Sequence, residues 1–301
     1  MAYEAKVLAD STSPAGHRVT TLQVTFPRLI LAEFNTHRVL SRNSASSRAI
    51  PVERRLEQIR ESPFVPEAFG KNQRGMQADD VLAATDNALA RNTWLLAAAD
   101  AVQHAHSLAS IGVHKQHANR VIETFAWHTV LCTSTEWANW DALRVSRMAQ
   151  PEMFKIAAMM RDARLASTPM PLGDGDWHLP LVREDGLTAE VALRGAGFDP
   201  IKVCVGRCAA VSFERQADTS PEKANAVYEK LRASGHMSPF EHALRPMGAD
   251  ELEMFRHPEY VWNAEKERFE KTGRDRFFLG NVEGWVQARK LLPGEDVYRG
   301  E

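Results

Sequence analysis

The stretch from His37 to Ala49, HRVLSRNSASSRA, concentrates side chains that could bind an anion. It holds three arginines and four serines shortly after an apolar run. An arginine presents a planar fork of donors that matches phosphate oxygens, and serine hydroxyls with backbone N–H groups can complete the coordination. Ser46, Ser47 and Arg48 are therefore candidate phosphate ligands. The alternative is that they belong to an ordinary solvated loop.

Two further arginines stand beside apolar residues that predict inward-facing helices. These are Arg120 in HANRVIETF and Arg144 in NWDALR. A buried arginine needs an anionic or acceptor partner. A bound anion or a salt bridge within the protein could each supply that partner.

The overall charge favours a local anion site over a general affinity for polyanions. The 301 residues include 37 basic and 39 acidic side chains, a net charge of -2. Because such a balance produces no long-range field, we expect neither nucleic acid nor membrane as a partner. The N-terminus lacks a secretory pattern, and no apolar run approaches the roughly 20 residues of a spanning helix. We therefore expect a cytoplasmic protein.

Metal and thiol chemistry find little support in the sequence. The chain has eleven histidines but no HExxH pattern, and we expect no metal site. Its three cysteines, Cys132, Cys204 and Cys208, are odd in number and scattered, which favours a reducing compartment. Cys204 and Cys208 are predicted to lie one helical turn apart and buried.

The first half of the chain begins with a predicted strand. Leu22, Val24 and Phe26 alternate with polar residues over 18–26, which is the period of a half-buried strand. Pro27 then begins a predicted helix, and a polar loop is predicted at 42–48. The segment 128–134 fits a buried strand or a helix end. Helical spacing or composition continues over 51–62, 79–110, 114–127, 135–143 and 150–166.

A loop-like stretch over 168–186 separates the second half. A helix is predicted over 203–213, and another is bounded by Ser220 as cap and Gly235 as stop. Ser238 and Glu241, three residues apart, predict a capping box.

Three segments resemble signatures of the flavin-dependent thymidylate synthase family. HRVLSRNSASSR is similar to the pattern R-H-R-x7-S. AAVSFERQADTSPEKANAVYEKLRASGHMSPFEH resembles a segment with a VSF run, an amphipathic helix and an H-x-[ST]-P-F-E-H element. RVIETFAWHTVLCTSTEWANWDALRVSRMAQPE resembles one with an N-F-x-x-L-R helix and an A-Q-x-E ending. Together they touch about half of the chain.

The resemblance implies an α/β fold, a mixed sheet with flanking helices and long helical segments, in one catalytic domain over 1–301. Residues 18–167 would hold the strand, the H-R-x7-S motif and the helical part, residues 199–248 the VSF and PFEH elements, and residues 249–301 a C-terminal extension. In the family the VSF and PFEH segment comes first, so the order here predicts a circular permutation.

The resemblance also implies roles for individual residues. Its flavin-binding positions correspond to His37, Arg38, Asn43, Asn139, Ser212, His236, Ser238 and Glu241. Its nucleotide-binding positions correspond to Ser46, Ser47, Arg48, Arg120 and Arg144, with Arg144 near the base. FAD and methylenetetrahydrofolate would be the cofactors, a deoxypyrimidine monophosphate the substrate, and a homotetramer with shared sites the assembly.

Three departures from the family pattern bear on the substrate. Thr36 replaces the first arginine of R-H-R, Glu33 replaces a common glutamine, and Asp141 occupies an apolar place in the NWDALR helix. A carboxylate is a natural partner for the amino group of cytosine. We therefore predict hydroxymethylation of dCMP to 5-hydroxymethyl-dCMP, a product that viruses with modified DNA need, with Glu33, Asp141 and Arg144 as catalytic residues. This reaction involves no net redox change, because water would complete the hydroxymethyl group.

Two alternatives stay open. The first is thymidylate synthesis from dUMP, in which NADPH would supply the reducing equivalents. The second is a protein that binds RNA or a nucleotide through Arg42 and Arg48 without catalysis. It is less favoured because the arginines of this chain are interspersed with acidic residues instead of forming a basic surface with stacking aromatics.

Overall fold

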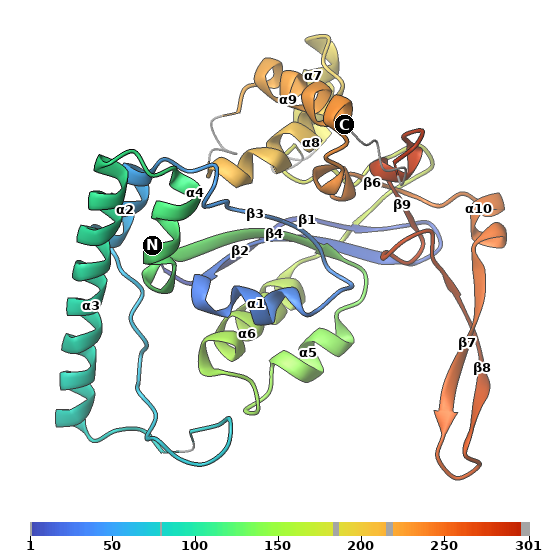
Figure 1. The fold of residues 1–301 in the computed structure, drawn as a ribbon. Coiled ribbons are helices and arrows are strands. Elements are labelled where there is room, and N and C mark those ends of the chain that lie inside the picture. Colours follow the sequence, from blue (N-terminus) through green and yellow to red (C-terminus); the bar gives the residue numbers. More distant parts are fainter. Residues whose placement is uncertain (1, 79, 183–186, 215–218, 296–301) are drawn as a thin grey trace.

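The computed structural model describes residues 2–78, 80–182, 187–214 and 219–295, and a five-stranded mixed sheet forms its centre (Figure 1). The strands are β1 (Glu4–Thr12), β2 (Arg18–Pro27), β3 (Ser41–Ser44), β4 (Trp127–Ser134) and β5 (Met170–Pro171), in the order β3-β4-β2-β1-β5. β5 runs parallel to β1, and the other neighbouring strands are antiparallel. The predicted α/β class is confirmed.

One face of the sheet is covered by α1 (Leu31–Asn35), α5 (Ala138–Arg144) and α6 (Pro151–Ala166) (Figure 1). Leu22, Val24 and Phe26 of β2 all belong to the hydrophobic cluster on this side, which confirms the alternation read from the sequence. α6 begins directly after Gln150 and buries Met153 and Met160 against the strands. Met153 and Met160, two of the three methionines of this helix, therefore belong to the core.

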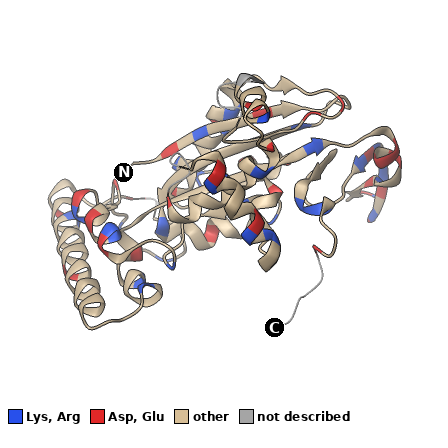
Figure 2. Ribbon diagram, turned by 90° about the horizontal axis from the view of Figure 1, so that it is seen from above, with Lys and Arg blue, Asp and Glu red and all other residues tan. Residues whose placement is uncertain are grey.

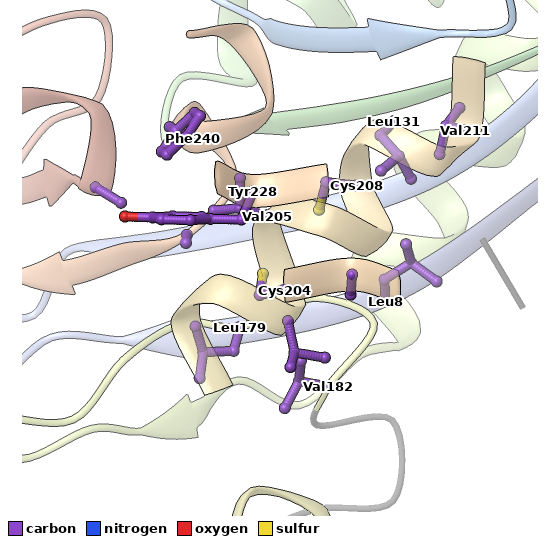
Figure 3. Close-up of a cluster of buried hydrophobic side chains, with 14 residues drawn as sticks. Leu8, Leu131, Leu179, Val182, Cys204, Val205, Cys208, Val211, Tyr228 and Phe240 are labelled. Carbon is purple, nitrogen blue, oxygen red and sulfur yellow. The ribbon is translucent and has the colours of Figure 1, made fainter. Parts of the chain in front are cut away.

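The opposite face is covered by α8 (Pro200–Ala210), the 3-10 helix η3 (Val211–Phe213) and α9 (Pro221–Ser234), with α7 (Leu187–Gly195) alongside (Figures 1 and 3). Leu131 points to this side, whereas its neighbours Val130 and Cys132 point to the other, as expected for a strand. Cys204 and Cys208 are buried one turn apart, as predicted, and are unpaired thiols.

α9 begins and ends where its sequence indicates. The side chain of Ser220 accepts a hydrogen bond from the backbone N–H of Lys223, and Pro221 occupies the first turn. Gly235 ends the helix with φ of 72°, a left-handed conformation that glycine adopts without the steric cost of a side chain.

A separate helical cluster lies at one side of the sheet (Figure 1). It contains α2 (Val52–Glu61), the long α3 (Ala84–Ser110), α4 (Lys115–Ala118) and the 3-10 helix η2 (Asn119–Phe125). The predicted helix over 79–110 therefore begins at Ala84, while residue 79 lies outside the described residues. The single helix expected over 114–127 is instead α4 followed by η2, and 128–134 is a strand.

The C-terminal part combines a short pair of strands with a projecting hairpin. β6 (Leu244–Pro246) pairs with β9 (Trp285–Gln287), and the 3-10 helix η6 (Ala288–Leu291) follows. Between β6 and β9 in the sequence come α10 (Ala249–Met254) and a hairpin of β7 (Arg256–Asn263) and β8 (Arg268–Phe277). The hairpin extends away from the sheet (Figure 1).

Three local predictions are wrong. The helix expected from Pro27 is short, comprising the 3-10 helix η1 (Arg28–Ile30) and α1, and the loop expected at 42–48 begins as strand β3. Pairing with β4 outweighs the low strand propensity of its serines and asparagine. The capping box at 238–241 is also absent: η5 (Ser238–Glu241) is a 3-10 helix whose N-cap is Met237, with no side-chain cap bond. The carboxylate of Glu241 binds Arg289 instead.

Figure 2 shows basic and acidic residues interspersed along the ribbon. This distribution agrees with the near-zero net charge. No helix among the described residues is long and apolar enough to cross a membrane.

Candidate active site

Two open clefts lie side by side where β3 meets the C-terminal half of the chain. The first, here called the serine cleft, has a volume of about 370 Å³ and is lined by the predicted ligands Asn43, Ser46, Ser47, Arg120, Ser212 and Ser238, with Arg28 and Arg42. The second, the tail cleft, measures about 420 Å³ and is lined by the predicted ligands Arg38, Ser238 and Glu241, with Arg42, Asn281, Gln287, Arg289 and Lys290. Because Arg42 and Ser238 line both, the two clefts are contiguous.

Backbone pairing brings the distant segments of the serine cleft together. β3 pairs with β4, and the N–H of Ala45 continues that pairing with a bond of 2.9 Å to the carbonyl of Thr129. The N–H of Ser46 then donates to the carbonyl of Ser212 in η3 at 3.0 Å. The side chain of Asn43 donates to the carbonyl of Cys208 in α8. Residues 41–48, here called the serine segment, are thus held in place by strand β4 and by the segment over 199–248.

A carboxylate of the protein, that of Glu123, binds three of the residues that line the serine cleft. Glu123 of η2 accepts from Arg28 at 2.8 Å, from Arg120 at 3.0 Å, and from the hydroxyl of Ser47. Burial alone would raise the pKa of Glu123, but these three donors more than offset it and hold the pKa below its usual 4.5. Glu123 is therefore an anion that engages donors of the cleft, although it is not itself one of the lining residues.

Arg28 is a largely buried cation of the serine cleft, with 9% of its side chain accessible. Its second nitrogen bonds to Nδ1 of His128 at 2.8 Å. Burial, followed by the charges of Arg28 and Arg55, lowers the pKa of His128 well below its usual value, so this imidazole is a neutral acceptor. Nε of Arg28 is buried without a hydrogen-bond partner among the described residues.

Arg120, expected to face inward, and Arg48, expected in a loop, are both accessible to solvent. The side chain of Arg120 is 55% exposed and pairs with Glu123, so the expectation of an inward-facing Arg120 is wrong, because η2 turns it to the rim. The guanidinium of Arg48 is exposed and has no partner among the described residues. Arg120 lines the serine cleft, whereas Arg48 lines neither cleft.

Comparison with known proteins identifies the family. Residues 5–170, more than half of the chain, match the family model described as Thymidylate synthase complementing protein. The chain belongs to this family. No curated protein matches it in sequence. Among solved structures, two of the UMP/dUMP methylase PolB from Streptomyces cacaoi are similar to the chain, each with a TM-score of 0.44. The structure bound with 5-Br dUMP is 16% identical and covers 54% of this chain and 89% of that chain. The structure bound with 5-Br UMP is 19% identical and covers 54% of this chain and 88% of that chain.

Family membership places the chain among flavin-dependent enzymes that transfer a one-carbon unit to C5 of a pyrimidine nucleotide, with a folate as carbon donor. The match covers the H-R-x7-S motif and the NWDALR helix. It ends before the segment over 199–248, so the predicted circular permutation stays a prediction.

The predicted base-recognition residues of this thymidylate synthase family member form a separate group next to α1. Arg144 donates to Oε1 of Glu33 at 2.5 Å and to the hydroxyl of Thr36 at 2.8 Å. Oε2 of Glu33 accepts no hydrogen bond from the described residues. Glu33 and Arg144 line neither cleft, although Arg42 donates to backbone carbonyls of this same turn.

Asp141 has a partner of its own. Both its oxygens accept from Arg164, at 2.7 and 2.6 Å, and the guanidinium of Arg164 lies 4.4 Å from the ring centre of Trp137. The carboxylate placed in an apolar part of the helix is thus explained by a salt bridge to α6. This pairing competes with any role for Asp141 at the base.

The remaining predicted flavin ligands lie outside the two clefts. His37 is buried with its ring 5.2 Å from that of Trp140, and burial, with Arg144 and Arg42, lowers its pKa. Asn139 is exposed at the start of α5. His236 is exposed after α9, where its ring bonds to Ser234.

Metal and thiol chemistry have no geometric support in the described part of the chain. It contains no group of three or more histidine, cysteine or acidic side chains that could hold a metal ion. None of the three cysteines lines either cleft. Burial raises the pKa of Cys132 to about 12, which keeps this thiol protonated.

Several charged residues at or beside the clefts were not predicted from the sequence, among them Arg28, Glu123, Arg289 and Lys290. Arg28 lies just before α1 and Glu123 in η2, and their only sequence signal is a charge beside apolar neighbours. Arg289 and Lys290 belong to the tail after 249, which resembles no family segment. Their position depends on long-range pairing between β6 and β9.

Proposed function

We propose that this protein hydroxymethylates dCMP, using FAD and methylenetetrahydrofolate, and that thymidylate synthesis from dUMP with NADPH is the alternative. The observation that carries the proposal is the convergence of the serine cleft. Ser46 and Ser47, Arg120, and Ser212 come from three segments that are distant in sequence, and all line one cleft of a chain in this family. Hydroxyl groups and guanidinium groups are the donors that a nucleotide phosphate requires.

The tail cleft fits a flavin dinucleotide in the chemistry of its donors. The exposed guanidinium of Arg38 has no partner among the described residues, and Arg42 and the hydroxyl of Ser238 lie beside it. These groups would hold the phosphates of FAD. Bound there, FAD would supply hydride in a methylation, whereas in hydroxymethylation it would serve to carry or position the one-carbon unit.

The preference for cytosine rests on Glu33. Its Oε1 is fixed by Arg144, whereas Oε2 is free to accept from the 4-amino group of cytosine. Uracil presents an O4 acceptor at the same place, which a carboxylate would repel. Because Arg164 engages both oxygens of Asp141, we favour Glu33 over Asp141 as the carboxylate at the base. Arg144 would orient Glu33.

A homotetramer with shared sites is part of this proposal. In one chain the group around Glu33 and Arg144 lines neither cleft, nor does Asn139 or His236. A second copy that completes each site would bring such residues to the ligands.

Product analysis tests the proposal. The purified protein is incubated with methylenetetrahydrofolate and either dCMP or dUMP, with and without NADPH, and the product mass is determined. We expect a hydroxymethyl group on dCMP without NADPH. A methyl group on dUMP that requires NADPH would establish the alternative. If neither dCMP nor dUMP is converted to a product, the remaining alternative is a protein that binds a nucleotide or RNA without catalysis.

Two variants separate the roles of the carboxylates. Glu33→Gln should lower the preference for dCMP over dUMP by about 10-fold or more, since a hydrogen bond to a charged group contributes about 1.5–3 kcal/mol. Asp141→Asn serves as the matched control, because its carboxylate is held by Arg164, and it should keep the preference. An unchanged ratio of kcat/KM values in Glu33→Gln would refute this account of base recognition.

A further inference from the structure

The C-terminal tail forms a built wall of the tail cleft. Trp285 and Val286 of β9 are fully buried, and β9 pairs with β6. The side chain of Asn281 donates to the hydroxyl of Ser41 at 2.9 Å, and that of Gln287 donates to the same hydroxyl at 3.0 Å. Residues 281–288 are therefore anchored directly to strand β3, which carries the serine segment.

This wall adds two cations to Arg38 and Arg42, the cations that the H-R segment (residues 37–42) contributes to the tail cleft. Arg289 and Lys290 line the cleft together with Arg38 and Arg42, whereas Glu241 is the one acidic residue among its described lining residues. The positive charge of the cleft therefore exceeds its negative charge. A ligand with more than one negative charge matches this balance.

Acidic neighbours hold the two tail cations in place without using all of their donors. Arg289 donates from Nε to Glu295 and from one terminal nitrogen to Glu241, at 2.5 and 2.6 Å. Lys290 donates to the other oxygen of Glu295 at 2.5 Å. The second terminal nitrogen of Arg289 and two N–H groups of Lys290 have no acceptor among the described residues. These donors remain available for a ligand.

We propose that Arg289 and Lys290, together with Arg38, bind the diphosphate of a flavin dinucleotide in the tail cleft. The inference rests on the proposed function, because that function requires FAD. It adds residues that lie far outside the range matched by the family. A diphosphate spreads its charge over several oxygens, so guanidinium and ammonium donors on opposite walls can bind it at the same time.

Flavin titration tests the assignment by binding alone. The apoprotein is titrated with FAD, and with riboflavin, which lacks phosphate, by following flavin fluorescence. Arg289→Gln and Lys290→Gln should each weaken FAD binding by about 10-fold, the value of one charge-assisted hydrogen bond, and leave riboflavin binding unchanged. Arg268→Gln is the control, because Arg268 lies in β8 and pairs with Glu270.

The outcomes separate the inference from the proposed function. Lys290→Gln guards against misfolding, since among the described residues Lys290 bonds to Glu295 alone. Wild-type affinity for FAD in a variant that combines Arg289→Gln and Lys290→Gln would overturn the inference while leaving the proposed function intact. If the wild-type protein binds no flavin, the proposed function and the flavin assignment both fail. Inorganic pyrophosphate, titrated in parallel by calorimetry, then shows whether the cationic wall binds another diphosphate.

Discussion

Glu123→Gln tests whether an internal carboxylate stands where the substrate phosphate binds. In the ligand-free protein the change leaves the guanidinium of Arg28, 9% exposed, without a charged partner, since His128 is neutral. Removing one partner of a fully buried pair costs about 3–5 kcal/mol, and the value is smaller here because Glu123 is 22% exposed. We expect a loss of about 2 kcal/mol, or about 4 °C in Tm for a chain of this size.

The same substitution should strengthen nucleotide binding. In the wild-type protein a phosphate must share Arg28 and Arg120 with Glu123, whereas in the variant both arginines are free of that negative charge. A gain of about 1 kcal/mol, roughly a five-fold lower Kd, is the size expected for a partly exposed charge.

Thermal unfolding with and without dCMP, dUMP or inorganic phosphate measures both effects. Glu123→Gln should start from a lower Tm and show a larger ligand-induced rise than the wild-type protein. Glu57→Gln, which alters an exposed residue of α2 that has no partner among the described residues, should change neither quantity. An equal or smaller rise in Glu123→Gln would refute the reasoning, because Glu123 would then position the arginines instead of competing with the ligand.

Two further predictions concern stability. Burial lowers the pKa of His242 to about 3, so the free energy of unfolding should fall as pH drops below 6.5, by about 2 kcal/mol at pH 5 for this residue, until the loss is complete near pH 3. Urea unfolding at pH 7 and pH 5 should show a weaker pH dependence in His242→Gln, and an unchanged dependence would contradict this. In Gly206→Ala the new Cβ would overlap the carbonyl of Ala224 where α8 packs on α9, at a cost of about 1–3 kcal/mol in unfolding free energy. Gly195→Ala, where no atom lies within 4 Å of the new Cβ, is its control, and equal Tm values in the two would contradict the argument.

Much of the fold follows from local patterns in the sequence. The period of two in β2 and the cap and stop signals of α9 specify elements whose backbone needs are met locally. β3 could not be predicted in this way, because its serines and asparagine become a strand only by pairing with β4, more than 80 residues away. The η5 turn likewise depends on contacts outside its own sequence, since Glu241 binds Arg289 and does not cap the helix.

The residues of the candidate site likewise divide into those that local sequence predicts and those that depend on long-range contacts. Ser46, Ser47 and Arg120 could be predicted because donors that bind phosphate are recognisable as residue types, and all three line one cleft. Glu123 could not, since nothing local distinguishes a carboxylate that faces arginines from one that faces water. The tail cations could not either, because β6 and β9 bring them to the H-R segment from more than 240 residues away.

Arg42 is the residue through which the two proposed anionic ligands would be held side by side. Its NH1 donates to the carbonyls of Asn35 and His37, each at 3.0 Å, so its orientation is fixed by the end of α1. The same side chain lines both clefts. A nucleotide phosphate in the serine cleft and a dinucleotide in the tail cleft would therefore be positioned against one fixed guanidinium. Transfer of a carbon unit between adjacent ligands requires this kind of shared reference, because reacting groups must be held within about 3–3.5 Å of each other.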